Sequence, residues 1–303
     1  VLSIGLVNVT PGAVSAATMS GASSQESGSY LKSSDYKKEI VALADIMSYG
    51  TGSSTKKVTR GQFSKMLTNA STFKNQKNTK KSSVYKDVTK KNTYASYINL
   101  SVTNKWMTGY SNGTFKPNDN IKLKDAAKAV IYLLGYGTKE NGSPESVSGA
   151  LAKFYELDLD KNIKKTKEQT LTGKDCMNLF YNLLNAKTST SQIYCETLDY
   201  SVNSDSEIDF MKLLEDNLSS SYITGDKVST KLPFKISSAT VYRNETPSTA
   251  KKIKSYDIVY YNKDIKLVWA YSNQVTGKVE AISPNDRNPE TVTIDGETFT
   301  LGN

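Results

Sequence analysis

The sequence predicts an α+β protein in which a helical domain precedes a smaller β-rich domain. Up to about residue 190, apolar residues recur with the period of helices, and one helix-loop-helix pattern occurs three times. Beyond about Ile193, apolar and polar residues alternate as they do in strands. We expect a leader over 1–29, three helical units over about 30–73, 84–136 and 140–190, and a β-rich domain over 191–303.

The first 29 residues have the pattern of an export leader. The chain begins at Val1 rather than at a methionine, and its first residues are mostly apolar. Small residues follow, which is typical of signal-peptidase cleavage after Ala16 or Ala17. A buried strand or helix of the mature protein is the alternative. We therefore expect a secreted protein, since no later segment reaches the ~18 consecutive apolar residues of a membrane span.

The segment from Val84 to Tyr136 predicts one compact unit. A first helix is indicated by four residues spaced along one helical face, and two glycines then turn the chain before a short strand and the extended segment at Pro117. A second amphipathic helix follows and is expected to end at Gly135. The face of the first helix consists of Ala95, Ile98, Val102 and Trp106, and that of the second consists of Leu123, Ala126, Ala127, Val130, Ile131 and Leu134.

Two further segments match the second helix of this unit. The upstream copy begins at Thr59 and the downstream copy begins at Thr172. A first helix is expected before each copy, over Tyr36–Tyr49 and about Ser146–Leu157. We expect the three second helices to pack together through matched core positions, because a single helix pair cannot bury its own apolar face. These positions are Phe63, Met66 and Leu67, then Ala126, Ala129 and Val130, and finally Cys176, Leu179 and Phe180.

The region beyond about residue 195 predicts a small antiparallel sheet that closes into a barrel or a sandwich. One helix, over about Glu207–Leu218, comes first. Runs of β-branched and aromatic residues then alternate with polar residues and are separated by turns rich in Asn, Asp and Gly. We expect this region to fold on its own, and we expect the natural chain to continue beyond Asn303. The predicted strands cover 238–242, 257–261, 267–271, 277–282 and 291–294.

The composition argues against catalysis. The chain has no histidine, which removes histidine triads, imidazole general bases and histidine metal sites, and no phosphate-binding glycine motif occurs. The segment Asp158–Asn162 begins like a calcium loop, but Ile163 and Gln169 stand where that loop needs a glycine and an acid. We therefore predict no enzyme activity, no cofactor and no metal site.

The net charge of +9 favours a polyanionic partner. For an exported chain, we expect that partner to be a wall polymer rather than nucleic acid. A cluster of lysines between 74 and 91 either contacts the polymer or forms a solvated linker. Cys176 lies on the predicted core face and is interpreted as a buried thiol, while a disulfide with Cys195 is the alternative.

The unit Val84–Tyr136 closely resembles the S-layer homology (SLH) repeat of bacterial surface proteins. The resemblance rests on the order of first helix, glycine loop and second helix, and on residues such as Trp106 and Gly109. It implies a triplet of repeats with pseudo-threefold symmetry and a localisation at the cell wall or cell surface. It also implies a function, which is non-covalent anchoring of an exported protein to an anionic, pyruvylated secondary cell-wall polysaccharide.

In this family the second helix starts with a Thr-Arg-Ala-Glu-like motif, whose arginine faces the carboxylate of a pyruvate ketal. The first copy has Thr59-Arg60-Gly61-Gln62 at this place. Thr59 and Gln62 can form a capping box, and Arg60 is expected at the surface, beside the free N–H groups of the helix start. The alternative is that the motif only caps a helix and that Arg60 is solvated.

The other two copies depart from the motif, with Leu123 and Gly173 at the arginine position. Lysines beside Leu123 can supply charge, although an ammonium group lacks the bidentate fork of arginine. A second hypothesis is therefore a degenerate module that assembles or self-associates in a surface layer without binding sugar. Trp106 fits either sugar stacking or core packing. The candidate polysaccharide-binding residues are Thr59, Arg60, Trp106, Gly109, Lys122 and Lys124.

Overall fold

The computed structural model describes residues 4–5, 32–76, 85–137, 146–219, 222–223, 231–244, 246–255, 257–271, 274–275, 277–287 and 289–300. The chain divides into two compact units. The helical unit comprises Lys32–Leu213, and the β-rich unit comprises Leu214–Asn303 together with Val1–Leu31. The protein is thus of mixed α and β structure, as predicted. In the described part of the chain, no helix is both long and apolar enough to span a membrane.

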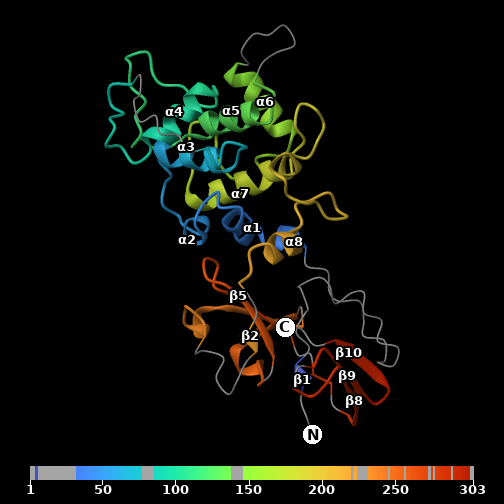
Figure 1. Ribbon diagram of the computed structural model, residues 1–303. Helices are drawn as coiled ribbons and strands as arrows, with labels where there is room; N and C mark the ends of the chain where they lie inside the picture. Colours follow the sequence, from blue (N-terminus) through green and yellow to red (C-terminus); the bar gives the residue numbers. More distant parts are fainter. Residues whose placement is uncertain are drawn as a thin grey trace. The chain divides into compact units, whose positions relative to one another are not determined.

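The helical unit contains the predicted second helices as α3, α5 and α7, which begin directly after Thr59, Lys122 and Thr172. Figure 1 shows these helices among the other helices of the unit. In chain order the elements are η2 Ser33–Asp35, α1 Lys37–Leu43, α2 Tyr49–Gly52, α3 Arg60–Asn69, α4 Ala95–Thr103, α5 Leu123–Leu133, α6 Val147–Glu156, α7 Gly173–Leu184, η3 Tyr194–Leu198 and α8 Phe210–Glu215.

Each long helix packs against a helix from another of the predicted copies. Helix α4 packs on α3, α6 packs on α5, and α1 packs on α7. A first helix therefore covers the second helix of the preceding copy, and α1 closes the circle by covering the last one. These helix pairs bury apolar faces, and the pair α1 and α7 ties the first and last parts of the helical unit together.

The segments before the three second helices form a closed ring of backbone hydrogen bonds. Val58 N donates to Leu171 O at 2.9 Å, Leu171 N donates to Ile121 O at 3.0 Å, and Ile121 N donates to Val58 O at 2.9 Å. All three side chains are buried. The ring fixes the relative positions of the three helix starts. Its hydrogen bonds join backbone groups, so they do not depend on the type of side chain.

The predicted core positions of α3, α5 and α7 are all buried, which confirms this part of the prediction. The rings of Phe63 and Phe180 lie 5.6 Å apart between centroids, so α3 and α7 meet directly. Helices α3 and α5 also contact each other. Small side chains on α5, such as Ala126 and Ala129, are completely buried and allow close packing.

Several element boundaries differ from the predictions. The helix expected over Tyr36–Tyr49 ends at Leu43, because Asp45 takes a left-handed backbone conformation with φ of 58°. In place of the short strand expected between the glycine loop and the second helix, the chain forms isolated bridges at Asn120 and Lys122. The end of α5 at a left-handed Gly135, with φ of 87°, is confirmed.

The helical unit extends to Leu213, beyond the boundary expected near residue 190. Tyr194 Oη donates to Ala70 O at 2.6 Å, and the ring of Phe210 stacks on that of Tyr36 at 4.2 Å. The segment after α7 therefore packs on the helices. The helix predicted over Glu207–Leu218 is shorter than expected, as α8 Phe210–Glu215. Cys176 and Cys195 are both buried free thiols.

The β-rich unit contains several sheets rather than the single antiparallel sheet that was predicted. A five-stranded sheet has the order β2-β5-β6-β3-β4, and β3 and β6 run parallel in it. A second sheet has the order β10-β9-β8, and β1 pairs with β7. The strands are β1 Ile4–Gly5, β2 Tyr222–Ile223, β3 Thr240–Arg243, β4 Thr246–Ser248, β5 Ile258–Asn262, β6 Leu267–Tyr271, β7 Gln274–Val275, β8 Val279–Ser283, β9 Thr291–Ile294 and β10 Glu297–Thr300.

The parallel pair of strands shows that the prediction of one purely antiparallel sheet was wrong. Strands β3 and β6 are separated in the sequence by β4 and β5, so β6 reaches β3 only after the hairpin with β5. Val241 and Val268 face each other in this register and belong to a buried apolar cluster. Apart from Ile4–Gly5, the expected leader lies outside the described residues.

Candidate functional site

A cavity of about 180 Å³ lies between the start of α3, the glycine loop after α4 and the start of α5. Five of the six residues predicted to bind polysaccharide line it. The sixth, Thr59, caps α3 instead, because its hydroxyl accepts from Gln62 N and its own N–H donates to Gln62 Oε1. The lining residues are Arg60, Trp106, Met107, Thr108, Gly109, Tyr110, Lys122, Lys124, Asp125 and Lys128.

The glycine loop is held in place by hydrogen bonds to two side chains of the segment before α4. Gly109 N donates to Tyr85 Oη at 2.9 Å, and a Cβ at this position would overlap the Tyr85 ring. The Asp87 carboxylate accepts from Phe115 N at 2.8 Å and from Lys116 N at 2.7 Å. These contacts require glycine at position 109 and give the cavity a preformed wall.

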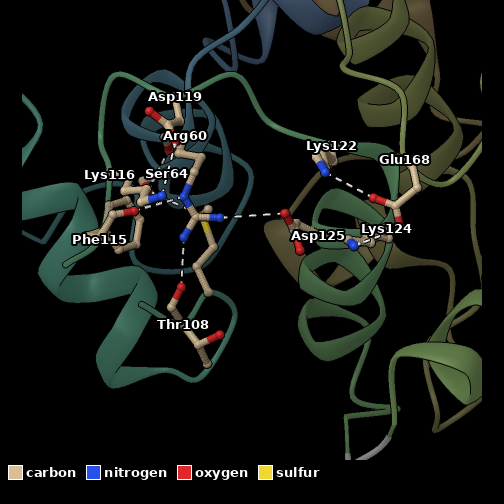
Figure 2. A network of polar contacts seen from close by, with 11 residues as sticks. Arg60, Ser64, Thr108, Phe115, Lys116, Asp119, Lys122, Lys124, Asp125 and Glu168 are labelled. Carbon is tan, nitrogen blue, oxygen red and sulfur yellow. Dashed lines mark hydrogen bonds and ion pairs between the residues drawn. The ribbon is translucent and has the colours of Figure 1, made fainter. Parts of the chain in front are cut away.

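Arg60 is buried in the wall of the cavity, with only 4% of its surface exposed. Its Nε donates to Phe115 O at 2.9 Å and its Nη2 donates to Thr108 O at 2.7 Å, as Figure 2 shows. The expectation of a surface side chain was therefore wrong. The long arginine side chain crosses from α3 to the next glycine loop and satisfies two carbonyl groups there.

The backbone N–H groups at the start of α3 are occupied as well. Arg60 N donates to Asp119 O at 2.8 Å, Gly61 N donates to Pro117 O at 2.9 Å, and Gln62 N is capped by Thr59. We expected free N–H groups that would converge on an anion. The adjacent chain segment and the Thr59 cap satisfy them instead, so these N–H groups are not available to an anion.

The guanidinium group of Arg60 still faces the cavity with its third nitrogen. Nη1 lies 3.7 Å from Asp125 Oδ2, which belongs to the first turn of α5. The ring of Phe115 lies under the guanidinium group, with its centroid 4.6 Å away, and the ring of Tyr110 lies 5.1 Å away. Arg60 therefore links α3, the glycine loop and α5 around the cavity.

Tyr110 is the exposed aromatic residue of this cavity, with 42% of its surface accessible. Trp106 is buried and packs edge-on against Phe73, with ring centroids 5.8 Å apart, which supports the core-packing alternative for this residue. Lys116 Nζ lies 4.6 Å from the Tyr110 ring. The sequence reasoning missed Tyr110, although its place directly after Gly109 marked it as part of the loop.

Lys122 and Lys124 face the cavity from the start of α5 and share one carboxylate. Glu168 Oε2 lies 3.0 Å from Lys122 Nζ, and Glu168 Oε1 lies 2.8 Å from Lys124 Nζ (Figure 2). Hydrogen bonds from Lys124 and then from Lys122 lower the pKa of Glu168 to about 2. The same contact raises the pKa of Lys124. The sequence gave no signal for Glu168, since more than forty residues separate it from both lysines.

Lys128 adds a fourth cationic side chain to the lining, one turn further along α5. Its Nζ lies 5.6 Å from the ring of Tyr132. Four lining side chains are thus cationic and one, Asp125, is acidic. Such a wall favours an anionic ligand, and the exposed ring of Tyr110 offers a face for a sugar.

The other two helix starts have different surroundings at the arginine position. Leu123 is completely buried in the core. Gly173 is buried too, and a Cβ there would overlap the carbonyl oxygen of Thr51. Among the described residues, the cationic cavity therefore lies at the start of α3, beside the glycine loop after α4 and the start of α5.

Comparison with known proteins finds a match to one family model. The family model of the S-layer homology domain matches residues 84–127, which include the glycine loop and the start of α5. "Middle cell wall protein" of Brevibacillus brevis is 25% identical over 151 residues, which cover 48% of this chain and 14% of that protein. "Surface layer protein" of Brevibacillus choshinensis is 25% identical over 136 residues, which cover 44% of this chain and 12% of that protein. The chain thus matches a small part of each relative.

Proposed function

Because the chain is a surface protein with an S-layer homology domain, we propose that it anchors an exported protein to the bacterial cell wall. The anchor binds an anionic secondary cell-wall polysaccharide without forming a covalent bond. The names of the two relatives, a middle cell wall protein and a surface layer protein, support a location at the wall or cell surface. The role is attachment rather than catalysis.

The observation that carries this proposal is the cavity beside Arg60. Five of the six candidate binding residues line it together, and they come from three separate segments of the chain. Lys122, Lys124 and Lys128 supply ammonium groups, and the buried Arg60 supplies a further positive charge. Tyr110 supplies an exposed ring that can stack on a sugar face.

We propose that the ligand carries carboxylates, and the family resemblance makes a pyruvate ketal the expected source. A carboxylate that enters the cavity meets the lysine side chains of α5 before it reaches Arg60, whose fork is already bonded to two carbonyl groups. The lysines therefore make the main charge-assisted contacts in this proposal. Arg60 acts mainly by shaping the cavity and adding positive potential.

We also propose that the helical unit is a triplet of SLH-type repeats with pseudo-threefold symmetry. The family model matches the middle repeat. The ring through Val58, Ile121 and Leu171 supports equivalence of the three helix starts. Further support comes from a second set of bonds, in which Arg60 N, Leu123 N and Gly173 N donate to carbonyls of the adjacent segment. The assigned domains are the leader, this triplet and the β-rich region.

An assembly role without sugar binding is the second candidate. Arg60 is engaged in structural hydrogen bonds, and the arginine position is filled by a buried leucine in α5 and by a packed glycine in α7. In this case the module would contribute to self-association in a surface layer. The cationic cavity would then have no carboxylate ligand.

A pull-down with purified wall sacculi separates these two functions. We expect the parent protein to bind intact sacculi and to lose binding when the secondary polysaccharide is removed. Lys124→Gln should weaken binding by roughly three- to tenfold, because one charge-assisted contact is lost. Lys65→Gln, on the exposed surface of α3 away from the cavity lining, is the matched control and should bind like the parent. Equal binding to sacculi with and without the polysaccharide would exclude the anchor function.

A further inference from the structure

Glu168 places a negative charge at the cationic edge of the cavity. Its carboxylate bridges the ammonium groups of Lys122 and Lys124 with contacts of 3.0 and 2.8 Å. Both lysines line the cavity, so their charges are partly neutralised before any ligand arrives. A carboxylate on the polysaccharide would interact with the same two ammonium groups, because both are partly exposed charge-assisted donors in this wall.

The backbone holds Glu168 at this position independently of its ion pairs. Leu123 N donates to Gln169 O at 2.9 Å, and Lys124 N donates to Lys167 O at 3.0 Å. The residues on either side of Glu168 are therefore bonded to the start of α5. The carboxylate is kept next to the two lysines by the fold, as a built-in counter-ion.

The side-chain contacts themselves are easily broken. The side chain of Glu168 is 51% exposed, and those of Lys122 and Lys124 are 44% and 31% exposed. Ion pairs in such surroundings are weak and are screened by salt. The glutamate can therefore turn into solvent when another carboxylate takes its place, while its backbone stays fixed.

We propose that Glu168 is an internal competitor of the ligand at the anion-binding cavity. A carboxylate of the polysaccharide displaces the Glu168 carboxylate from Lys122 and Lys124, and binding is an exchange of one counter-ion for another. This inference rests on the proposed anchor function. It also gives the site selectivity, because a neutral polymer has no group to replace the glutamate and leaves the ion pairs closed.

The test compares two substitutions that remove the same charge. Glu168→Gln removes the competitor, whereas Glu156→Gln removes a carboxylate that pairs with Lys153 on α6, outside the cavity lining. The probe is the solubilised secondary wall polysaccharide, measured by calorimetry with the full chain. We expect Glu168→Gln to tighten binding roughly three- to tenfold at low salt, and Glu156→Gln to stay within about twofold of the parent. Thermal unfolding of both variants checks that the fold is kept.

Two further measurements define the outcome. The gain from Glu168→Gln should shrink when salt is raised from about 50 to about 500 mM, because the competition is Coulombic. It should vanish with polysaccharide whose carboxylates have been reduced to alcohols. If the parent binds but both variants bind like it, Glu168 does not compete and the anchor function stands. If neither the parent nor Glu168→Gln binds the polysaccharide, the anchor function itself is wrong.

Discussion

The starts of α3 and α7 have the same backbone arrangement but differ at their first helical residue, which is the long Arg60 in α3 and the side-chain-free Gly173 in α7. Both helices are capped by threonine in a capping box, Thr59 with Gln62 and Thr172 with Asp175. Both first residues donate their N–H to a neighbouring segment, at 2.8 Å for Arg60 and 3.0 Å for Gly173. Arg60 nevertheless extends into the next glycine loop, whereas Gly173 packs against the backbone of α2.

This difference shows that the backbone arrangement of the helix starts and the side chains of the cavity depend on different parts of the sequence. The backbone ring and the caps need few particular side chains, so they tolerate either residue. What the first helical position can hold depends on the segment that packs against it. At α3 that segment is an open loop with carbonyl groups to satisfy, and at α7 it is the carbonyl oxygen of Thr51. The cavity lies at the start of α3, where the Arg60 side chain reaches the carbonyl groups of the facing loop.

The largest expected effect comes from Arg60→Ala, which should lower the free energy of unfolding by about 3 kcal/mol. The substitution removes two hydrogen bonds from a charged donor and leaves the carbonyl groups of Thr108 and Phe115 without it. Arg60→Lys should recover part of this loss, because an ammonium group can reach one carbonyl but not both. Urea unfolding monitored by circular dichroism measures the change. Unchanged stability of Arg60→Ala would mean that Arg60 does not tie α3 to the loop.

Gly173→Ala should destabilise the protein by about 2 kcal/mol, since the new methyl group would overlap Thr51 O and force the backbone apart. Gly50→Ala is the matched control, because a Cβ at Gly50 meets nothing within 4 Å. It should be neutral or slightly stabilising. Thermal unfolding of the two variants checks the comparison. Similar melting temperatures for both would show that the start of α7 has room for a side chain after all.

The smallest expected effect is the loss of stability at low pH when Glu168 is protonated and its ion pairs with Lys122 and Lys124 are lost. These ion pairs lie at the start of α5, where Lys122 makes no side-chain cap. Hydrogen bonds from Lys124 and Lys122 lower the pKa of Glu168 to about 2. Stability from this contact is therefore complete above the ordinary pKa of a glutamate, near 4.5, and is lost as the pH falls towards 2. The effect is small because the carboxylate is exposed.

Melting temperatures between about pH 5 and pH 2 measure this contribution. The parent should lose slightly more stability over this range than Glu168→Gln, which has no carboxylate to protonate at this position. Glu156→Gln controls for the removal of a charge elsewhere on the surface. A parallel decline of the parent and Glu168→Gln would indicate that the charge on Glu168 adds nothing to the start of α5.

Much of the helical unit could be predicted from the sequence because its signals are local. The helix starts follow from Thr59 and Thr172 as caps, and the buried faces follow from the spacing of apolar residues such as Phe63 and Phe180. The glycine loop, the family resemblance and the charge of the lysines beside Leu123 then indicated five residues that line one cavity. Each of these predictions depends on residues within a few helical turns of one another.

The tertiary structure decided what depends on contacts between distant segments. The chain order does not reveal that α1 covers α7, that the helical unit extends to Leu213, or that β3 and β6 run parallel. The sequence placed Arg60 among the candidate site residues but did not reveal that its side chain is buried, because the carbonyl groups that accept from it lie 48 and 55 residues away. Glu168 was missed for the same reason. The sequence thus determined which residues begin the helices, whereas the packing of distant loops decided which of those residues can meet a ligand.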